Sequence, residues 1–455
     1  MAPFVVRTVD KTLVKRVKDY IEQGDSNALI KVIDHIKAAD LADLIEYLQP
    51  DERLLIFKLL EPEGAGDVFV EIEPPVQERI LRDLDNQAIS EIVKKLDSDD
   101  AADLMGDLPG ERAKEIIKTV GDDVSEDLEK LLPYPEDTAG GIMALEFVSV
   151  NADITLRDAV ESIREKREEV ENLYHVWAVD DFERLVGVVS LKDFILEPPE
   201  RKVRDIMNPE VISINAYSDQ EEAIRLTRKY DLVNIPVVDE QNRLIGRITH
   251  DDIIDIIEEE VDEDISLMAG VIDQEIAEDS LLKISRARLP WLIVALFGGI
   301  LAAVVISQFR LCLEKIIGLS FFFPVIMAMG GNTGTQASSV TVRGLATGDI
   351  SLIHVGKRLW METRVALING ILCGILLGFI VGLWLSDYRL GFIVFSTMVF
   401  LVSISGLIGS AVPLALKKLE IDPALASGPF VTTSNDVLSL IIYLGLVTLF
   451  LRIIA

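Results

Sequence analysis

Hydrophobic and polar residues follow three different patterns along the chain. Over the first 132 residues, apolar positions recur every three or four residues, which predicts amphipathic helices. Between about 142 and 260, short β-branched runs alternate with amphipathic segments, so strands and helices are expected together. The last part has five apolar stretches of about 20 residues or more, long enough to cross a bilayer. They lie near 290–309, 316–342, 363–385, 391–416 and 433–452.

Three segments of the first part resemble one another. Each has an amphipathic stretch, a proline turn, a Glu-Arg pair and a second amphipathic stretch: LADLIEYLQPDERLLIFKLL, AGDVFVEIEPPVQERILRDL and AADLMGDLPGERAKEIIKTV. The recurrence favours helical hairpins stacked as an α-helical superhelical array over residues 1–132, a kind of domain that usually serves as a binding or regulatory surface. Unrelated helical hairpins would give a similar pattern.

A linker rich in proline and glycine, LPYPEDTAGG (132–141), introduces two similar halves, which we assign to residues 137–262. Each half predicts an amphipathic helix, a short strand, an acidic turn, a second strand that contains glycine, and a closing helix. Both halves carry a run of glycine, hydroxyl residue and aspartate, at Gly187-x-x-Ser190-x-x-Asp193 and Gly246-x-x-Thr249-x-x-Asp252. With Asn234-Ile-Pro236-Val, these runs resemble a tandem pair of cystathionine-β-synthase (CBS) domains, which have an α/β fold.

The resemblance to CBS domains implies a nucleotide pocket. In that family the corresponding run often lines an adenine-nucleotide site, where the aspartate holds the ribose hydroxyls. The matching residues here are Gly246, Thr249 and Asp252, and the implied ligand is ATP or another adenine nucleotide. Many such domains bind no ligand, and a purely structural role in dimerisation is the alternative.

A dense acidic run closes the second half: HDDIIDIIEEEVDED (250–264). Residues three or four apart share a helix face, and like charges this dense destabilise a helix unless something neutralises them. A solvated face is the ordinary interpretation of such a run. Here the run stands directly before a predicted linking (plug) helix, 263–286, that leads into the first apolar stretch. This position favours a cation-sensing role.

Charge divides the chain at the same place. The net charge is −31, but residues from Arg286 onward hold 7 acids and 12 bases, so the first 285 residues carry a net charge of −36. A nucleic-acid partner is disfavoured because phosphate binding needs basic patches, whereas an acidic surface attracts cations. The two cysteines, Cys312 and Cys373, provide neither a disulfide framework nor a zinc spacing.

The basic residues set the expected orientation in the membrane. They gather before the first apolar stretch, between the second and third, and after the fourth: Arg286, Arg288, Arg343, Lys357, Arg358, Arg364, Lys417 and Lys418. The N-terminal stretch MAPFVVRTVDK lacks the apolar core of a signal peptide. We therefore expect a multi-pass protein of the plasma (inner) membrane with a cytoplasmic N-terminus, an external C-terminus and an all-α, five-helix transmembrane domain over 287–455.

One carboxylate is out of place among the apolar stretches. Asp436 lies in GPFVTTSNDVLSLIIYLGL, and no lysine or arginine lies near mid-depth in the five stretches. A charge at membrane depth costs roughly 3 kcal/mol or more, so it normally faces a partner or a water-filled path. We interpret Asp436 as facing a mobile cation. A protonated aspartate, or one paired with an arginine from a helix end, is the alternative.

Two polar stretches interrupt the apolar pattern, FFFPVIMAMGGNTGTQASSVTVRG and EIDPALASGPFVTTSND. Non-helical or hydrated backbone at this depth is expected only where it is buried in protein or lines a cavity. Neutral oxygens with few charges suit a hard cation that keeps its water, as Mg²⁺ does. One Asp436 per chain faces a double positive charge, so two chains meeting at this residue on a twofold axis would neutralise the ion as a homodimer.

The order of these parts and two membrane motifs resemble the MgtE family of bacterial magnesium channels. The motifs are Pro324-x-x-x-x-x-Gly330-Gly-Asn-Thr-Gly and Asp422-Pro-Ala-x-x-Ser-Gly-Pro-x-x-Thr-Thr-x-x-Asp436. The resemblance implies a homodimeric, Mg²⁺-selective channel in a lipid bilayer, with a pore lined by the second and fifth spans. The implied pore residues are Asp436, which binds hydrated Mg²⁺, Thr432 through a carbonyl oxygen, and Gly331, Asn332 and Gly334. Thr335 and Gly428 replace an asparagine found in some members, which leaves selectivity against Ca²⁺, Mn²⁺ or Co²⁺ open.

The same resemblance implies inhibitory cytosolic Mg²⁺ sites between the helical array, the CBS pair and the linking helix. The matching acids are Asp100, Asp252, Asp255, Glu260, Glu263 and Asp264, with Asp422 on the membrane side. The expected function of this multidomain chain is Mg²⁺ uptake through a channel that cytosolic Mg²⁺ shuts. An ion-coupled divalent cation carrier is the alternative, and a membrane-anchored nucleotide sensor without transport is a third hypothesis. No enzyme is expected: the weighed candidate, a membrane metalloprotease, needs a His-Glu-x-x-His run, which the sequence lacks.

Overall fold

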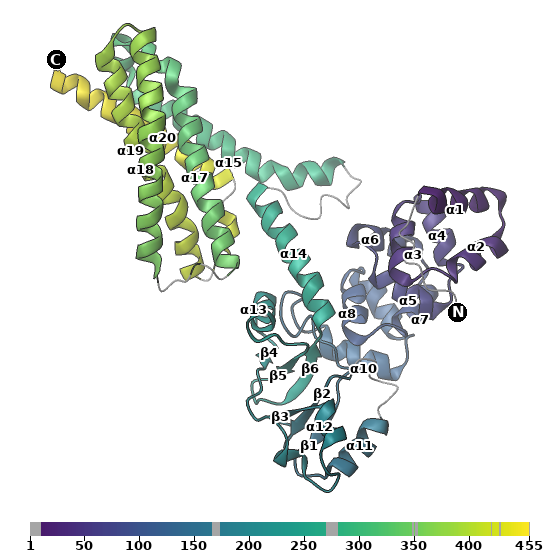
Figure 1. Cartoon of the computed structure of the whole chain (residues 1–455). Helices are drawn as coiled ribbons and strands as arrows, with labels where there is room; N and C mark the ends of the chain where they lie inside the picture. The colour runs from purple at the N-terminus through teal and green to yellow at the C-terminus, as the bar shows by residue number, and fades with distance from the viewer. Residues whose placement is uncertain are drawn as a thin grey trace. The chain divides into compact units, whose positions relative to one another are not determined.

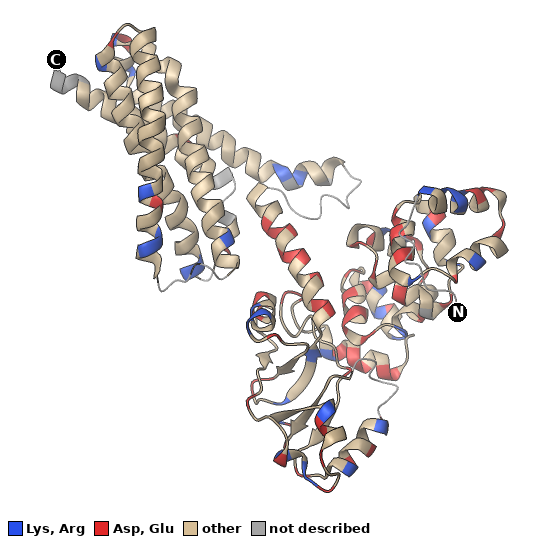
Figure 2. Cartoon of the chain, in the orientation of Figure 1, with Lys and Arg blue, Asp and Glu red and all other residues tan. Residues whose placement is uncertain are grey.

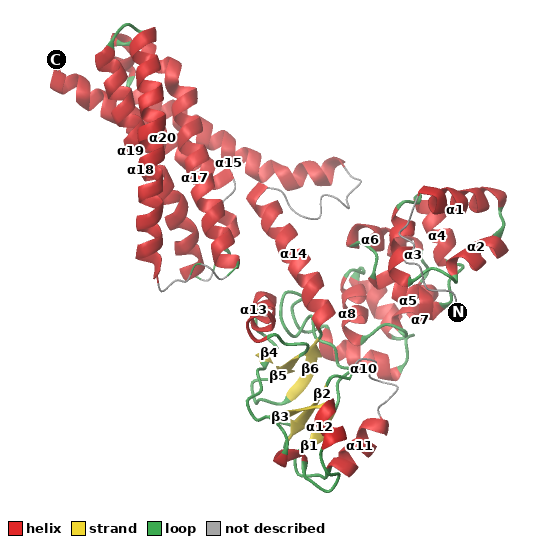
Figure 3. Cartoon of the chain, viewed as in Figure 1, coloured by secondary structure: helices red, strands yellow, loops and turns green. Residues whose placement is uncertain are grey.

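The computed structural model of the chain describes residues 11–165, 173–269, 281–347, 350, 354–419, 421–426 and 429–454. The chain divides into two compact units, Met1–Glu260 and Val261–Ala455 (Figure 1). Helices and strands are mixed in the first unit, whereas the described part of the second is helical (Figure 3). Three sequence-based statements concern residues outside this description: the first ten residues, positions 270–280 of the linking helix, and Gly428.

Short helices form the N-terminal part of the first unit. They are α1 (Lys11–Gln23), α2 (Ser26–Ile33), α3 (Ala38–Glu46), α4 (Pro50–Phe57), α5 (Pro62–Val70), α6 (Pro74–Asp83), α7 (Asn86–Val93), α8 (Ser98–Gly106), α9 (Gly110–Ile117) and α10 (Asp122–Leu131). Packing follows every second helix: α3 lies against α5, α5 against α7, and α7 against α9. This repeated contact between neighbouring hairpins confirms the predicted helical array.

The recurring proline and arginine of the array have separate structural roles. Proline begins α4, α5 and α6, where its missing N–H leaves no helical bond unmade. The Arg53 guanidinium donates to the carbonyl oxygens of Ile45 (3.1 Å), Leu48 (2.9 Å) and Glu46 (2.9 Å) at the end of α3. Arg112 likewise donates to the carbonyls of Leu81 (2.7 Å) and Leu84 at the end of α6. Each arginine thus supplies a side-chain donor to carbonyls at the C-terminal end of an earlier helix, where intrahelical donors run out.

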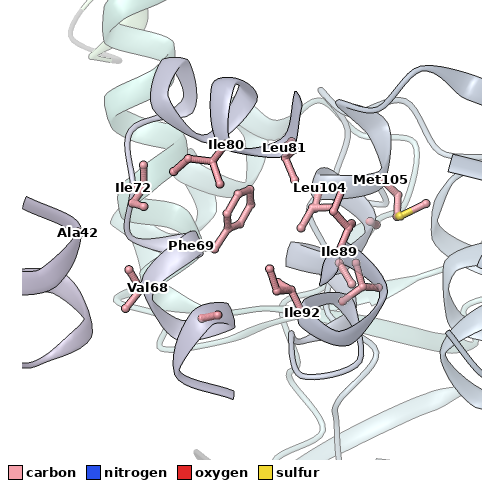
Figure 4. Packing of buried hydrophobic residues seen from close by; sticks show 14 of the residues in the cluster. Ala42, Val68, Phe69, Ile72, Ile80, Leu81, Ile89, Ile92, Leu104 and Met105 are labelled. Carbon is pink, nitrogen blue, oxygen red and sulfur yellow. The ribbon is translucent and has the colours of Figure 1, made fainter. Parts of the chain in front are cut away.

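Apolar side chains from successive helices fill the interior of the array (Figure 4). Phe69 of α5 and Ile80 of α6 point toward one another, and Ile89 of α7 lies near Leu104 of α8. All four side chains are buried, and the cluster continues into the second CBS half through Met143 and its neighbours. The array and the second CBS half therefore share one hydrophobic core, whereas the first half has a core of its own.

The CBS pair contains two three-stranded sheets of identical topology. In each sheet a short first strand runs parallel to the second, which pairs antiparallel with the third. The strands are β1 (Ser149–Asn151), β2 (His175–Val179) and β3 (Leu185–Ser190), then β4 (Ile214–Asn215), β5 (Ile235–Val238) and β6 (Leu244–Ile248). The helices are α11 (Leu156–Glu165), α12 (Leu191–Leu196) and α13 (Gln220–Tyr230), with a 3₁₀ turn η1 (Val203–Asp205). The predicted α/β tandem is confirmed; β1 and β4 are additional strands, too short to produce a periodic signal.

The acidic run lies on one continuous helix, α14 (His250–Ala269). This helix closes the second CBS half and extends from the first unit into the second. Figure 2 shows acidic residues along α14, whereas the long helices of the second unit carry few charges. The boundary placed at 262–263 from sequence falls inside α14, because nothing in HDDIIDIIEEEVDED interrupts helical geometry.

The second unit holds five helices that are long and apolar enough to cross a membrane. Its elements are α15 (Leu281–Gln308), α16 (Arg310–Lys315), η3 (Ile317–Phe322), α17 (Phe323–Ala346), α18 (Val355–Trp384), α19 (Tyr388–Lys418), η5 (Pro423–Ala426) and α20 (Pro429–Ile454). The predicted spans agree with these helices, but α18 begins at Val355 rather than near 363. Its polar first turns are helical, with Arg358 and Glu362 forming an i,i+4 ion pair.

The polar stretch GGNTGTQ does not interrupt α17, which is helical from Phe323 to Ala346. Its glycines instead allow close helix packing. A Cβ on Gly334 would lie 1.8 Å from Asn435 Nδ2 of α20, and one on Gly409 of α19 would lie 2.3 Å from the Gly334 carbonyl oxygen. The second polar stretch does break the helical pattern, since η5 separates α19 from α20.

Candidate cation sites

Asp436 lies on α20, where its side chain borders a cavity of about 430 Å³ within the second unit. The carboxylate is half-buried, and among the described residues no arginine, lysine or other hydrogen-bond donor pairs with it. An ionised group in such a place requires a partner from outside the helix bundle. The cavity is lined by Met268, Ala269, Ala295, Gly298, Gly299, Ala302, Met327, Thr335, Thr432, Thr433 and Asp436.

Two hydroxyls lie beside the carboxylate in this cavity. The Thr335 Oγ1 of α17 and the Thr432 Oγ1 of α20 are 3.4 Å apart. Thr432 precedes Asp436 by one helical turn, and in an α-helix the carbonyl of residue i accepts from the N–H of residue i+4. The Thr432 hydroxyl is thus one oxygen at the cavity, and the contribution of a carbonyl oxygen near Thr432, which the family resemblance implies, stays a prediction.

The α17 backbone approaches the carboxylate closely. A Cβ on Gly331 would lie 3.3 Å from Asp436 Oδ1 and 3.6 Å from Thr432 Cγ2. The other two residues of this stretch that were named from sequence have different surroundings. Gly334 is covered by Asn435, and Asn332 is exposed on α17. The structure thus brings Gly331, Thr432 and Asp436 together and places Asn332 and Gly334 away from the cavity lining.

One wall of the cavity was not anticipated from sequence. It is formed by small residues of α15, at Ala295, Gly298, Gly299 and Ala302. A Cβ on Gly298 would lie 1.7 Å from Thr433 Cγ2, so glycine is required for α15 to approach α20. The glycine pair in WLIVALFGGILAA was the available signal, since adjacent glycines in an apolar span indicate a close helix contact.

A second group of acids forms in the first unit, where α8 faces the start of α14. Burial and the negative charge of Asp252 raise the pKa of Asp100 to about 7, with Asp97, Asp255 and Asp251 adding to the shift. Burial and Asp252 also raise the pKa of Asp99 well above its ordinary value. The Asp252 carboxylate accepts hydrogen bonds from Thr249 N (2.8 Å) and Thr249 Oγ1 (2.5 Å).

Two further acids, Asp103 and Asp107, follow Asp99 along the chain by one and two helical turns. Burial, together with Asp100 and Glu259, raises the pKa of Asp103 to about 7. Burial and Glu136 raise the pKa of Asp107. We call this set the α8–α14 acidic cluster; it comprises Asp99, Asp100, Asp103, Asp107, Glu136, Asp252, Asp255 and Glu259. Sequence reasoning selected Asp100, Asp252 and Asp255 as regulatory residues, and it grouped Asp99 with Asp100 and Glu259 with the face of Asp252 and Asp255. It missed Asp103, Asp107 and Glu136, although Asp99, Asp103 and Asp107 recur at helical spacing.

Carboxylates repel one another in this cluster, although Thr249 and Arg247 stabilise the charge of Asp252. Burial and neighbouring carboxylates both disfavour the charged forms and raise the pKa values of six of its aspartates: Asp99, Asp100, Asp103, Asp107, Asp252 and Asp255. Among the described residues, no three acidic, histidine or cysteine side chains lie close enough to hold one bare metal ion. A cation that keeps part of its water shell can neutralise carboxylates over longer distances, which is the ordinary behaviour of Mg²⁺.

The remaining acids named from sequence lie elsewhere. Glu260 accepts a hydrogen bond from Gln220 Nε2 (2.7 Å) in the first unit. Glu263 and Asp264 lie on the part of α14 that belongs to the second unit. Asp422 accepts from Ala424 N (2.8 Å) and caps η5. The structure therefore gathers Asp100, Asp252 and Asp255 in the first unit, whereas Glu263, Asp264 and Asp422 belong to the second unit.

The three positions named for a nucleotide lie at the end of β6 and the start of α14. A Cβ on Gly246 would lie 2.6 Å from Met143 Sδ, so this glycine allows the linker segment to cross the strand. Asp252 is the third, and its carboxylate is already bonded to Thr249 and faces α8. One aspartate thus belongs both to the nucleotide run and to the acidic cluster.

Comparison with known families agrees with this division of the chain. Residues 323–446 match a family described as a divalent cation transporter, MgtE. Residues 36–137 match the MgtE intracellular N domain, and residues 139–200 and 203–259 match CBS domains.

Whole-length relatives are similar over most of the chain. The magnesium transporter MgtE of Bacillus subtilis (strain 168) is 38% identical over 329 residues, which are 72% of this chain and 73% of the relative. The magnesium transporter MgtE of Thermus thermophilus is 36% identical over 330 residues, again 72% and 73%. A crystal structure of the cytosolic domain of the Mg²⁺ channel MgtE in complex with ATP superposes with a TM-score of 0.51 and 33% identity, covering 54% of this chain and all of that one.

Proposed function

The chain belongs to the MgtE family of magnesium transporters, and from this premise we propose that it is a Mg²⁺-selective channel that cytosolic Mg²⁺ shuts. The observation that carries the proposal is the Asp436 carboxylate, which borders a cavity and has no partner among the described residues. Such a group needs a counter-ion, and a permeating cation supplies one.

The cavity suits a cation that retains its water. Six waters occupy about 180 Å³ of liquid volume, and the cavity measures about 430 Å³. The hydroxyls of Thr335 and Thr432 can accept hydrogen bonds from bound water, while Asp436 supplies the charge. Tight ligation would hinder release, so outer-shell contacts of this kind favour conduction.

Charge balance supports a homodimer. One Asp436 offers a single negative charge to a divalent ion, and a second copy placed about a twofold axis would supply the other. We infer that two chains meet with their Asp436 side chains facing a shared axis. Cysteine at position 436 in an otherwise cysteine-free chain tests this. A hydrated ion between the two side chains holds them farther apart than a disulfide allows, so a bifunctional thiol reagent long enough to span a hydrated ion is used. A cross-linked dimer is expected, and its absence in the bilayer argues against the shared axis.

The α8–α14 acidic cluster supports regulation by the transported ion. Mg²⁺ at the cluster would bind the arrangement in which α8 and α14 are close more strongly than any arrangement in which they separate. A ligand shifts an equilibrium only by such a difference in affinity. Low Mg²⁺ would leave the carboxylates repelling one another and favour separation. Protease protection of the first unit should therefore rise with Mg²⁺, and no change up to about 10 mM, a level suited to weak carboxylate sites, would contradict this regulation.

Orientation and nucleotide binding are further parts of the proposal. The basic residues flanking the spans support a plasma (inner) membrane protein with a cytoplasmic N-terminus and an external C-terminus. The solved relative with bound ATP supports ATP as a ligand of the CBS pair, at Gly246, Thr249 and Asp252. Titration calorimetry with ATP, repeated on Asp252→Ala, tests this assignment; equal binding by the two proteins would contradict it.

An ion-coupled carrier is the second candidate, because a single acid among membrane helices can also relay protons. Planar-bilayer recording separates the two. Discrete single-channel Mg²⁺ currents that disappear in Asp436→Ala are expected for the channel. Mg²⁺ flux without discrete currents, accompanied by a fixed ratio of proton or sodium movement, would instead establish the carrier.

A further inference from the structure

The first residue of α8 makes a dense set of hydrogen bonds to the segment that leads into the CBS pair. The Ser98 backbone N–H donates to Glu146 Oε1 (3.1 Å), and the Ser98 hydroxyl donates to Glu146 Oε2 (2.8 Å). The same hydroxyl accepts from the Leu145 N–H (2.8 Å). Ser98 is only 7% exposed, so these bonds are shielded from water. We call these three bonds the Ser98–Glu146 latch.

Glu146 also complements the start of α8 electrostatically. The first N–H groups of a helix have no partner within it, and the helix dipole favours negative charge there. The preceding residue, Asp97, makes no side-chain cap. The carboxylate that satisfies α8 therefore comes from 48 residues further along the chain, rather than from the helix's own N-terminal sequence.

The segment that carries Glu146 is fixed to the second CBS half. The Ala144 N–H donates to the Arg247 carbonyl (2.8 Å), and the Arg247 N–H donates to the Ala144 carbonyl (2.9 Å). Arg247 lies on β6, which leads directly into Asp252 and α14. The latch thus connects the helix bearing Asp99 and Asp100 to the strand that positions Asp252.

Repulsion and attraction therefore act together where α8 lies against the second CBS half. The carboxylates of Asp100 on α8 and Asp252 on α14 repel one another, whereas the latch joins α8, through neutral donors, to the segment that pairs with β6 just before α14. The shared apolar core also holds α8 and the second CBS half together, but it does not fix their relative position. Apolar contacts tolerate sliding more readily than paired hydrogen bonds do. Hydrogen bonds that hold α8 next to the repelling carboxylates therefore reduce the binding free energy that a bridging cation must supply to close the cluster.

We propose that the Ser98–Glu146 latch favours the closed position of α8 beside the CBS pair through bonds that need no cation, and so lowers the Mg²⁺ concentration at which the α8–α14 acidic cluster closes. Ser98 acts as a positioning residue, since it contacts Glu146 rather than an ion. The proposal rests on the proposed regulation by Mg²⁺, which it deepens by naming what determines its threshold.

The test is the Mg²⁺ midpoint for protease protection of the first unit, measured on the full-length protein in lipid nanodiscs. Loss of a shielded hydrogen bond to a charged group weakens closure by about tenfold. If two ions bridge the cluster, the midpoint for Ser98→Ala rises about threefold, the square root of that factor. Full protection at saturating Mg²⁺ shows that the variant is folded.

Two further variants separate the latch from other roles. Ser125→Ala, on α10, is the matched control and should keep the wild-type midpoint, because among the described residues no hydrogen bond joins its side chain to the CBS pair. Glu146→Gln retains an acceptor for the Ser98 N–H and should shift the midpoint less than Ser98→Ala. A large shift in Glu146→Gln with none in Ser98→Ala would make Glu146 an ion ligand and overturn the latch.

The Mg²⁺ dependence of protease protection in the wild type shows whether a negative result contradicts the latch alone or the proposed regulation by Mg²⁺ as well. Mg²⁺-dependent protection in the wild type with an unchanged midpoint in Ser98→Ala overturns the latch alone. A wild type whose protection is independent of Mg²⁺ overturns the regulation, and the latch with it.

Discussion

The backbone of Gly331 lies against the carboxylate of Asp436: a Cβ at position 331 would lie 3.3 Å from Oδ1. The contact joins α17 to α20 beside the cavity, and a methyl group at position 331 would push the Asp436 carboxylate away by a few tenths of an ångström. Gly331→Ala should therefore lower Mg²⁺ uptake into liposomes several-fold without unfolding the protein. Gly445→Ala on α20 is the control, because an added methyl meets no atom within 4 Å there. Equal uptake by both variants would show that the close approach is unimportant.

Removing one hydroxyl from the cavity tests the role of water-shell contacts. Thr335→Val keeps the shape of the side chain but cannot hydrogen-bond to a hydrated ion. A net hydrogen bond contributes about 1 kcal/mol, so roughly a fivefold loss of Mg²⁺ flux is expected. Thr448→Val serves for comparison, since that hydroxyl donates to the Leu444 carbonyl within α20. A fall in flux for Thr448→Val but not Thr335→Val would reverse the assignment.

The acidic cluster should make closure of the first unit depend on pH when divalent ions are absent. Asp100 and Asp103 have pKa values of about 7 in the folded unit, against an ordinary value of 3.8. Protons therefore bind the closed form more tightly, and the stability they provide is complete below about pH 4 and lost as pH rises through about 7.

In EDTA, protease protection should be stronger at pH 6 than at pH 8, by about tenfold in the closing equilibrium for each of the two groups. Saturating Mg²⁺ should flatten this dependence, because the ion neutralises the same carboxylates. Protection that increases toward pH 8 in EDTA would contradict the sign of the effect.

Arg112 provides a test of how the helical array is held together. Its guanidinium donates to Asn86 Oδ1 (2.8 Å) as well as to the Leu81 and Leu84 carbonyls. Arg112→Ala leaves these acceptors without a donor and should lower the free energy of unfolding by about 2 kcal/mol or more. Arg82→Ala removes an exposed ion pair with Glu78 and should cost about 0.5 kcal/mol or less. Denaturant titration compares the two, and similar losses would refute the capping role.

Sequence alone could predict the elements whose signal is local. The five spans, the paired CBS halves and the proline-led hairpins each arise from periodicity or from turn residues within a short segment. Asp436 could also be selected, because a carboxylate in an apolar span is costly wherever that span packs. The early start of α18 was missed because Arg358 and Glu362 look polar singly and are compatible with the span only as a pair.

The parts that sequence could not provide depend on contacts between distant segments. The α15 wall of the cavity follows from Gly298 meeting Thr433, and no pattern within either helix specifies that pairing. Asp103 looks like a solvated residue until α8 lies near Glu259. The bonds from Ser98 to Glu146 span 48 residues and belong to no motif.

Mg²⁺ uptake into proteoliposomes by Asp436→Asn tests the central claim most directly. The substitution keeps the size of the side chain and removes its charge. Asp387→Asn is the matched control, because Asp387 caps the start of α19 through the N–H groups of Arg389 and Leu390, which asparagine can also do. The account predicts wild-type uptake in Asp387→Asn and near-complete loss in Asp436→Asn. Wild-type uptake in a folded Asp436→Asn protein would contradict it.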